Sequence, residues 1–128
     1  MDSKADAGAV TLKVNLRDKL VFSSRGKWLH PLFDLGRFLD HHDLDPRQLT
    51  VYDKIVGKAA ALLIVRLGIG HVKVGILSSL GETVFIHHNV NYAYEKRVAR
   101  ILCRTEDILQ NTHDLDEAYE LLLARSLE

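Results

Sequence analysis

The chain has 128 residues, of which 47% are hydrophobic, and this is enough for one domain with an ordinary core. Its 17 Lys and Arg residues balance 17 Asp and Glu residues, and the zero net charge argues against a protein built to cover a nucleic acid or an anionic membrane. A single cysteine, Cys103, excludes a disulfide within the chain and a metal site made from several thiolates.

The hydropathy of the chain predicts neither a membrane span nor a secretory leader. The longest apolar run, Ala59–Val65, is far shorter than the roughly 20 residues that a spanning helix needs. Residues 1–9 are small and polar, so they predict a loose tail rather than a cleaved leader. We therefore expect a cytoplasmic protein with one domain over residues 10–128.

The first elements after the tail are a hairpin and a helix. Apolar and polar residues alternate in Leu12–Leu16 and, less regularly, in Leu20–Phe22, which predicts two antiparallel strands joined by a turn. From Pro31 onwards, leucines and a phenylalanine recur at helical spacing as far as Asp40. This spacing predicts an amphipathic helix that packs one face on the core.

The stretch from Val51 to Gly68 is the most apolar part of the sequence. Because its second half is apolar on every side, it predicts a central helix enclosed by other elements and fed by a short strand over Leu49–Tyr52. The polar residues before Arg66 are gathered at its beginning. Free backbone N–H groups at a helix start favour anions, which makes this end the best candidate site in the chain.

The rest of the chain continues the alternation of strands and helices. His71–Leu77 predicts an interior strand, Ser79–Ile86 a helix, Asn91–Glu95 a weaker strand and Asp114–Leu123 a closing helix. Alternating strands and helices indicate an α/β domain. We expect three layers, α-β-α, with helices on both faces of a mixed sheet of about five strands.

The run Asp53–Leu63, with the sequence DKIVGKAAALL, resembles the signature of a small, uncharacterised prokaryotic family. The similarity extends from the hairpin to the C-terminal region, where Cys103–Glu106 lies at the family's Cys-Pro-Met-Glu and Glu117–Tyr119 matches its closing segment. The resemblance implies a cytidine-deaminase-like fold and a pocket at the start of the central helix. It implies no particular activity, because the family has no settled one.

Zinc-dependent deamination requires His and Cys ligands and a proton-transferring Glu at two helix starts. In this chain those helix starts would lie near Asp53–Ala60 and Ser78–Glu82, and neither stretch contains a His or a Cys. The zinc-bound water that drives deamination would have nothing to hold it. We therefore expect no metal and no cofactor.

The leading hypothesis is a binding site for a nucleotide-like or phosphorylated ligand. If the helix begins near Asp53, then Lys54 and Lys58 share one face and form an anion clamp, while Gly57 lets the ligand approach the backbone. In the alternative, Gly57 packs against a strand, the lysines extend to solvent and Asp53 only caps the helix. Ser79, with its neighbour Ser78, either lines the same pocket or simply caps the next helix.

Two other functions remain open at this point. The chain is an enzyme if Cys103 is a nucleophile or Glu106 a general acid or base, but a buried and inert cysteine is the commoner outcome. It is a structural or protein-interaction domain if it instead forms a homodimer through an exposed sheet edge or helix.

Overall fold

The computed structural model describes residues 10–101, 109 and 112–126 of the chain. The expected tail over residues 1–9 lies outside this part. The described elements follow one another along the chain in this order: β1 (Leu12–Leu16), β2 (Lys19–Ser24), α1 (His30–Asp40), the 3-10 turn η2 (Pro46–Gln48), β3 (Leu49–Val56), α2 (Lys58–Arg66), β4 (His71–Ser78), α3 (Ser79–His87), β5 (Asn91–Val98) and α5 (Leu115–Ser126). None of the described helices is long and apolar enough to cross a membrane.

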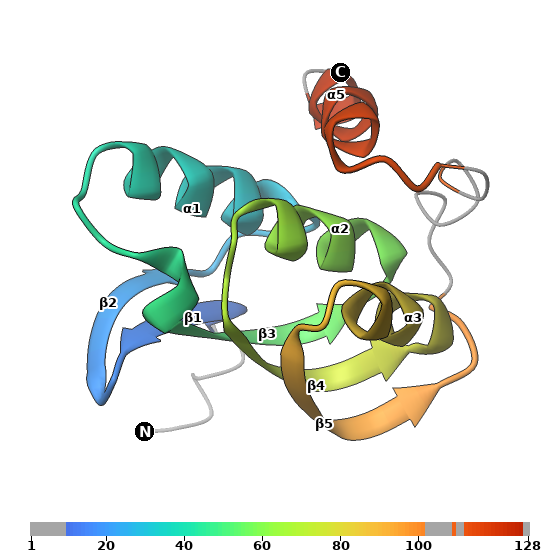
Figure 1. Cartoon of the computed structure of the whole chain (residues 1–128), viewed down its shortest axis with the longest axis horizontal. Coiled ribbons are helices and arrows are strands. Elements are labelled where there is room, and N and C mark those ends of the chain that lie inside the picture. Colours follow the sequence, from blue (N-terminus) through green and yellow to red (C-terminus); the bar gives the residue numbers. More distant parts are fainter. Residues whose placement is uncertain (1–9, 102–108, 110–111, 127–128) are drawn as a thin grey trace.

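The strands form one mixed sheet of five strands in the order β2-β1-β3-β4-β5. β1 is antiparallel to both β2 and β3, while β3, β4 and β5 run parallel (Figure 1). The predicted α/β class with a mixed sheet of about five strands is therefore confirmed. Parallel neighbours need crossover connections, and α2 and α3 supply them.

Helices α1, α2 and α3 lie on the same side of the sheet, and α5 packs on the outer side of α2 (Figure 1). The arrangement follows from handedness, because successive right-handed crossovers that advance in one direction place their helices on one face. On the opposite face, β1, β3 and β4 carry polar side chains that include Lys13, Tyr52 and Lys73, and these alternate with buried apolar ones. The expectation that helices cover both faces is wrong for the described residues: the layers run sheet, helices α1 to α3, then α5.

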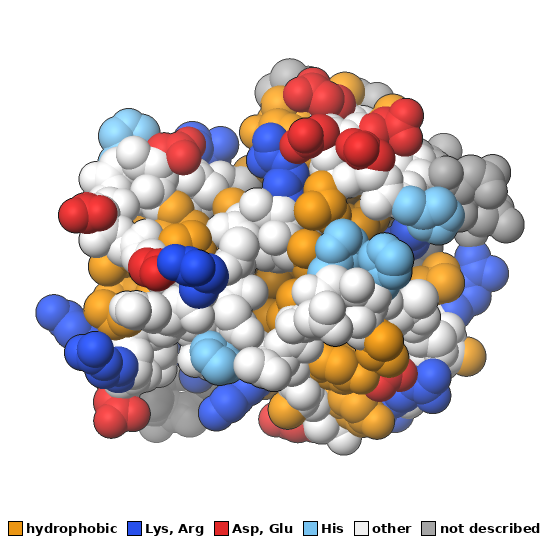
Figure 2. Space-filling model, in the orientation of Figure 1, with side chains coloured by type: hydrophobic (Ala, Val, Ile, Leu, Met, Phe, Trp, Pro, Cys, Tyr) orange, Lys and Arg blue, Asp and Glu red, His pale blue; other side chains and the backbone are white. Residues whose placement is uncertain are grey.

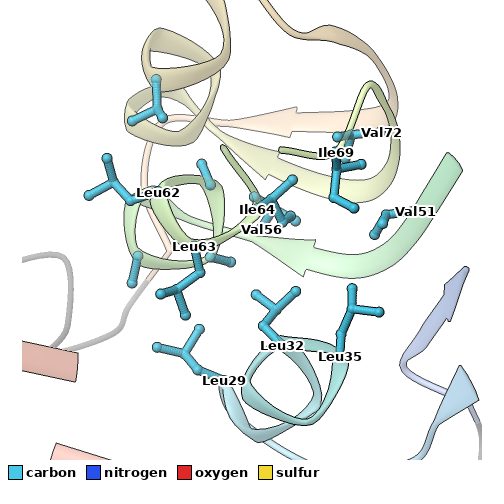
Figure 3. Packing of buried hydrophobic residues seen from close by; sticks show 14 of the residues in the cluster. Leu29, Leu32, Leu35, Val51, Val56, Leu62, Leu63, Ile64, Ile69 and Val72 are labelled. Carbon is cyan, nitrogen blue, oxygen red and sulfur yellow. The ribbon is translucent and has the colours of Figure 1, made fainter. Parts of the chain in front are cut away.

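The core lies between the sheet and this helix layer. Leu32 and Leu35 of α1 point toward Val51 and Val56 of β3 and toward Leu63 of α2 (Figure 3). All five side chains are less than 5% exposed. Their burial fixes how α1 and α2 lie against the end of β3, where the candidate site is found.

The predicted central helix is wrong at its beginning. Val51–Val56 belongs to β3, Gly57 is the N-cap, and the helix starts at Lys58. Strand pairing explains the difference, because β3 is hydrogen-bonded to β1 on one side and to β4 on the other as far as Val56. The β-branched Ile55 and Val56 suit such a strand better than a helix.

Two smaller boundaries also differ from the prediction. Ser78, rather than Ser79, is the N-cap of α3, and its Oγ accepts a hydrogen bond from the Gly81 N–H at 3.0 Å. β5 continues to Val98, beyond the predicted end at Glu95.

Candidate functional site

A cavity of about 370 Å³ opens beside the carboxyl end of β3. Thr11 and Trp28 lie on one side of it, Asp53 and Ile55 come from β3, and Ala59 and Ala60 come from the first turn of α2. Ligands of open α/β sheets commonly bind outside the carboxyl ends of the strands, and the volume is in the usual range for a small-molecule site. The cavity is therefore the candidate functional site.

Asp53 is the acidic residue among the described residues that line this cavity. Burial raises the pKa of its carboxyl group from 3.8 to about 7, while hydrogen bonds from the backbone N–H groups of Ile55 and Lys54 act in the opposite direction. Its partners on the neighbouring strands, Leu12 and Val74, are buried and apolar. The carboxyl group therefore changes its charge near neutral pH, which suits a group that binds or exchanges a proton at the site.

Trp28 forms an aromatic wall of the cavity in a strained conformation. Its backbone φ is 58°, in the left-handed region that side chains other than glycine rarely adopt. The residue remains 40% exposed, and its ring lies 5.3 Å from the His30 ring and 6.4 Å from the Phe33 ring, measured between centroids. The fold thus holds a large aromatic side chain at the cavity at a cost in backbone energy.

The loop that carries Trp28 is tied to the start of β1. The Thr11 hydroxyl donates to the Gly26 carbonyl oxygen at 2.8 Å, and the Gly26 N–H donates to the Ser24 Oγ at 3.0 Å. Both bonds hold Gly26, which lies two residues before Trp28 in the chain.

Gly57 and the first turn of α2 form part of the cavity wall. The Ala61 N–H donates to the Gly57 carbonyl oxygen at 3.0 Å, so the N–H groups of Ala59 and Ala60 precede this first bond of the helix. A Cβ added at Gly81 of α3 would lie 3.1 Å from the same carbonyl oxygen. The starts of α2 and α3 are therefore packed side by side, as the predicted pocket requires.

The expected anion clamp does not form. Lys54 is an exposed residue of β3 and Lys58 is the first residue of α2, so they do not share a helix face. Lys58 is 5% exposed, and its Nζ donates to the Leu109 carbonyl oxygen at 2.5 Å, which joins α2 to the segment before α5. Asp53 does not cap α2 either, because it lies within β3 and Gly57 is the N-cap.

The other predicted site residues lie away from the described cavity wall. Ser78 is buried and caps α3, and the Ser79 Oγ donates to the Val98 carbonyl oxygen at 3.4 Å. Cys103 and Glu106 lie outside the described residues. Across the part of the chain that the structure describes, no three His, Cys, Asp or Glu side chains come close enough together to hold a metal ion.

The sequence analysis missed Trp28, together with its neighbour Lys27 in the cavity wall. The available signal was the single tryptophan of the chain, placed directly after a Gly-Lys turn.

On the face drawn in Figure 2, Lys and Arg side chains are scattered among acidic ones, and acidic side chains gather over α5. The described part of this face therefore offers no continuous basic band.

These features define a small α/β domain with a mixed five-stranded sheet and a cavity at the carboxyl end of its central strand. The family model TM1506, described as a domain of unknown function (DUF1893), matches residues 5–123. The chain therefore belongs to the DUF1893 family.

A solved relative has the same fold. The crystal structure of a DUF1893 family protein (TM1506) from Thermotoga maritima matches with a TM-score of 0.81 and 19% sequence identity, over 94% of this chain and 84% of that one. A comparison with curated proteins finds no match.

Proposed function

We propose that the chain is a small-molecule-binding domain whose cavity takes a nucleotide-like ligand. The observation that carries the proposal is the meeting of Trp28, Asp53 and the first turn of α2 around one space of about 370 Å³. An exposed aromatic ring supports stacking of a planar base, and a carboxyl group supports hydrogen bonding to its edge.

The cavity favours the ring part of such a ligand over a phosphate. Its walls include apolar groups from Ile55, Ala59 and Ala60, and burial makes Asp53 the group that fixes orientation. A phosphate, where the ligand carries one, fits near the exposed Lys27 and Lys54. The proposed phosphate contacts are thus Lys27 and Lys54, in place of the Lys54 and Lys58 pair that the sequence predicts.

A deaminase-like ancestry without zinc chemistry is part of the proposal. The family resemblance implies that topology, and the packing of the α2 and α3 starts against each other supports it. Zinc-dependent deaminases use this corner for their metal ligands. In the present chain Gly57, Ala59 and Ala60 stand at this corner, and these residues supply only backbone groups and methyl groups.

Thermal unfolding with a panel of nucleosides and nucleotides tests the proposal. A ligand at 100 times its Kd should stabilise the protein by about 2.7 kcal/mol. Trp28→Ala should abolish the shift while the variant still unfolds cooperatively, and Leu80→Ala, at an exposed apolar position on α3, is the matched control. If no member of the panel shifts the midpoint at millimolar concentration, the proposal fails.

The alternatives stay predictions. An enzyme that uses Cys103 or Glu106 would lose turnover in Cys103→Ser or Glu106→Gln. A structural or interaction domain would show no shift with any nucleoside and would form a stable dimer in solution.

A further inference from the structure

We infer that the ring bound in this cavity is a planar nitrogen heterocycle that presents two adjacent N–H donors to Asp53, as guanine does with its ring N–H and its 2-amino group. The inference rests on the proposed function and names the chemical class of its ligand.

Hydrogen bonds within the cavity wall limit which polar groups can select a ligand. The Thr11 hydroxyl hydrogen is used by the Gly26 carbonyl oxygen at 2.8 Å, with the Ser24 carbonyl oxygen at 3.3 Å. The Lys54 N–H donates to the Thr11 carbonyl oxygen at 3.1 Å. Among the described side chains of the wall, Lys27, Lys54 and the Trp28 indole can only donate, so the ionised Asp53 carboxyl group is the one that can only accept hydrogen bonds from the edge of a ring.

The carboxyl group of Asp53 already has backbone donors. The Ile55 N–H donates to it, the Lys54 N–H contributes while also donating to the Thr11 carbonyl oxygen, and both contacts favour the ionised form. An ionised carboxylate has about four lone-pair sites and accepts only. Leu12 and Val74 on either side offer no further side-chain donor. Because Asp53 lines the cavity, a ligand that pairs with its remaining lone pairs must supply N–H donors.

The shape and polarity of the cavity walls suit a flat ring. Trp28 presents a ring from the loop side, while Ile55 and the methyl groups of Ala59 and Ala60 are apolar. Such walls pack the faces of a flat ring and leave its polar edge to a single group. A ring with two neighbouring donors forms a paired, charge-assisted contact with a carboxylate, which is stronger than a contact between neutral groups.

Rings of the adenine or cytosine type present one acceptor and one donor at the corresponding edge. They would pair with the carboxylic acid and would not pair with the carboxylate. Guanine-type and adenine-type ligands are therefore separated by the sign of their pH dependence.

The test is calorimetric titration of the full chain with guanosine, inosine and adenosine between pH 5.5 and pH 8.5. Guanosine should bind at least ~10-fold more tightly than inosine, which lacks the 2-amino group, and ~100-fold more tightly than adenosine. Guanosine affinity should rise about tenfold per pH unit below 7 and level off above it. Besides Asp53, the charged residues that line the described cavity wall are Lys27 and Lys54.

Asp53→Asn replaces one acceptor with a donor. It should weaken guanosine binding by ~100-fold, remove the pH dependence and shift the preference toward xanthosine, which carries a 2-oxo group in place of the 2-amino group. The gain of xanthosine binding shows that the variant is folded. Asp43→Asn, at an exposed position, is the matched control and should behave like the parent chain.

The outcomes separate the inference from the proposed function. Equal affinities for the three nucleosides, lost in Trp28→Ala but kept in Asp53→Asn, would overturn the inference and leave nucleotide-like binding intact. Tighter binding of adenosine at low pH would overturn the two-donor edge in the same way. No binding of any nucleoside at millimolar concentration would remove both.

Discussion

The substitution Asp53→Asn should change how stability depends on pH. Burial raises the pKa of Asp53 from 3.8 to about 7, so the folded chain holds this proton more tightly than the unfolded chain does. The corresponding contribution to stability is fully present below pH 3.8 and is lost as the pH rises toward 7. Above pH 7 to 8 the loss is complete and the curve is flat again.

The size of the effect follows from the shift. One pKa unit corresponds to about 1.4 kcal/mol, so the full cost of ionising Asp53 in the folded chain is roughly 4 kcal/mol. Asp53 lines an open cavity and is only partly buried, so water reaching the carboxylate reduces this figure. Between pH 5 and pH 8 we expect the parent chain to lose about 2 kcal/mol through this group. Asn is close in shape to the protonated acid and cannot ionise, so the variant should not show this loss.

Urea unfolding at pH 5, 6, 7 and 8, with equal m values, measures the difference. The free energy of unfolding of Asp53→Asn should rise relative to the parent chain by about 2 kcal/mol across this range. The lowered pKa values of Asp45 and Glu82 act below pH 4.5 in both proteins and cancel. Parallel curves for the two proteins would refute the desolvation of Asp53.

Further substitutions at five positions test the local geometry. Trp28→Gly should be more stable than Trp28→Ala by about 1 kcal/mol, because φ is 58°; equal midpoints in urea would contradict the left-handed backbone. Gly75→Ala would bring a Cβ within 2.5 Å of a β3 carbonyl oxygen and should cost ~2 kcal/mol or more. Gly36→Ala in α1 meets its nearest atom at 3.5 Å and should stabilise by roughly 0.5–1 kcal/mol in the same urea assay. Ser78→Ala should destabilise by about 1–2 kcal/mol, and Ser79→Ala by less. A larger loss of stability in Ser79→Ala than in Ser78→Ala would indicate that Ser79 is the N-cap of α3.

Much of the fold could be predicted because local patterns and tertiary structure agree. The alternation in Leu12–Leu16, the leucine spacing after Pro31 and the β-branched run from His71 each match the observed element. In these segments the residues whose pattern predicts the element also place its apolar face against the core. The side of the sheet on which the helices pack depends on crossover direction, which spacing along the chain does not encode.

The boundary between β3 and α2 could not be predicted for a physical reason. β3 pairs with strands on both sides, and its apolar residues continue without a break into the buried helix. Periodicity does not separate a buried strand from a buried helix. Gly57, for which the sequence predicts a place inside the helix where a ligand approaches the backbone, marks the change. The sequence predicts Asp53 and Lys54 on a helix face, whereas they lie on β3, and the predicted anion clamp therefore does not form.

Two unfavourable features meet at the cavity. Trp28 has a left-handed backbone, and Asp53 keeps a carboxyl group in a desolvated position. Each costs stability, and replacing Asp53 by Asn or Trp28 by Gly would be a simple change of sequence that relieves the cost. A purely structural domain gains nothing from keeping an aromatic ring and an acid in such positions. Strain of this kind is typical of sites that bind a ligand, where the energy lost in folding is recovered in the complex. This concentration at one place favours a binding site over a protein-interaction surface elsewhere on the domain.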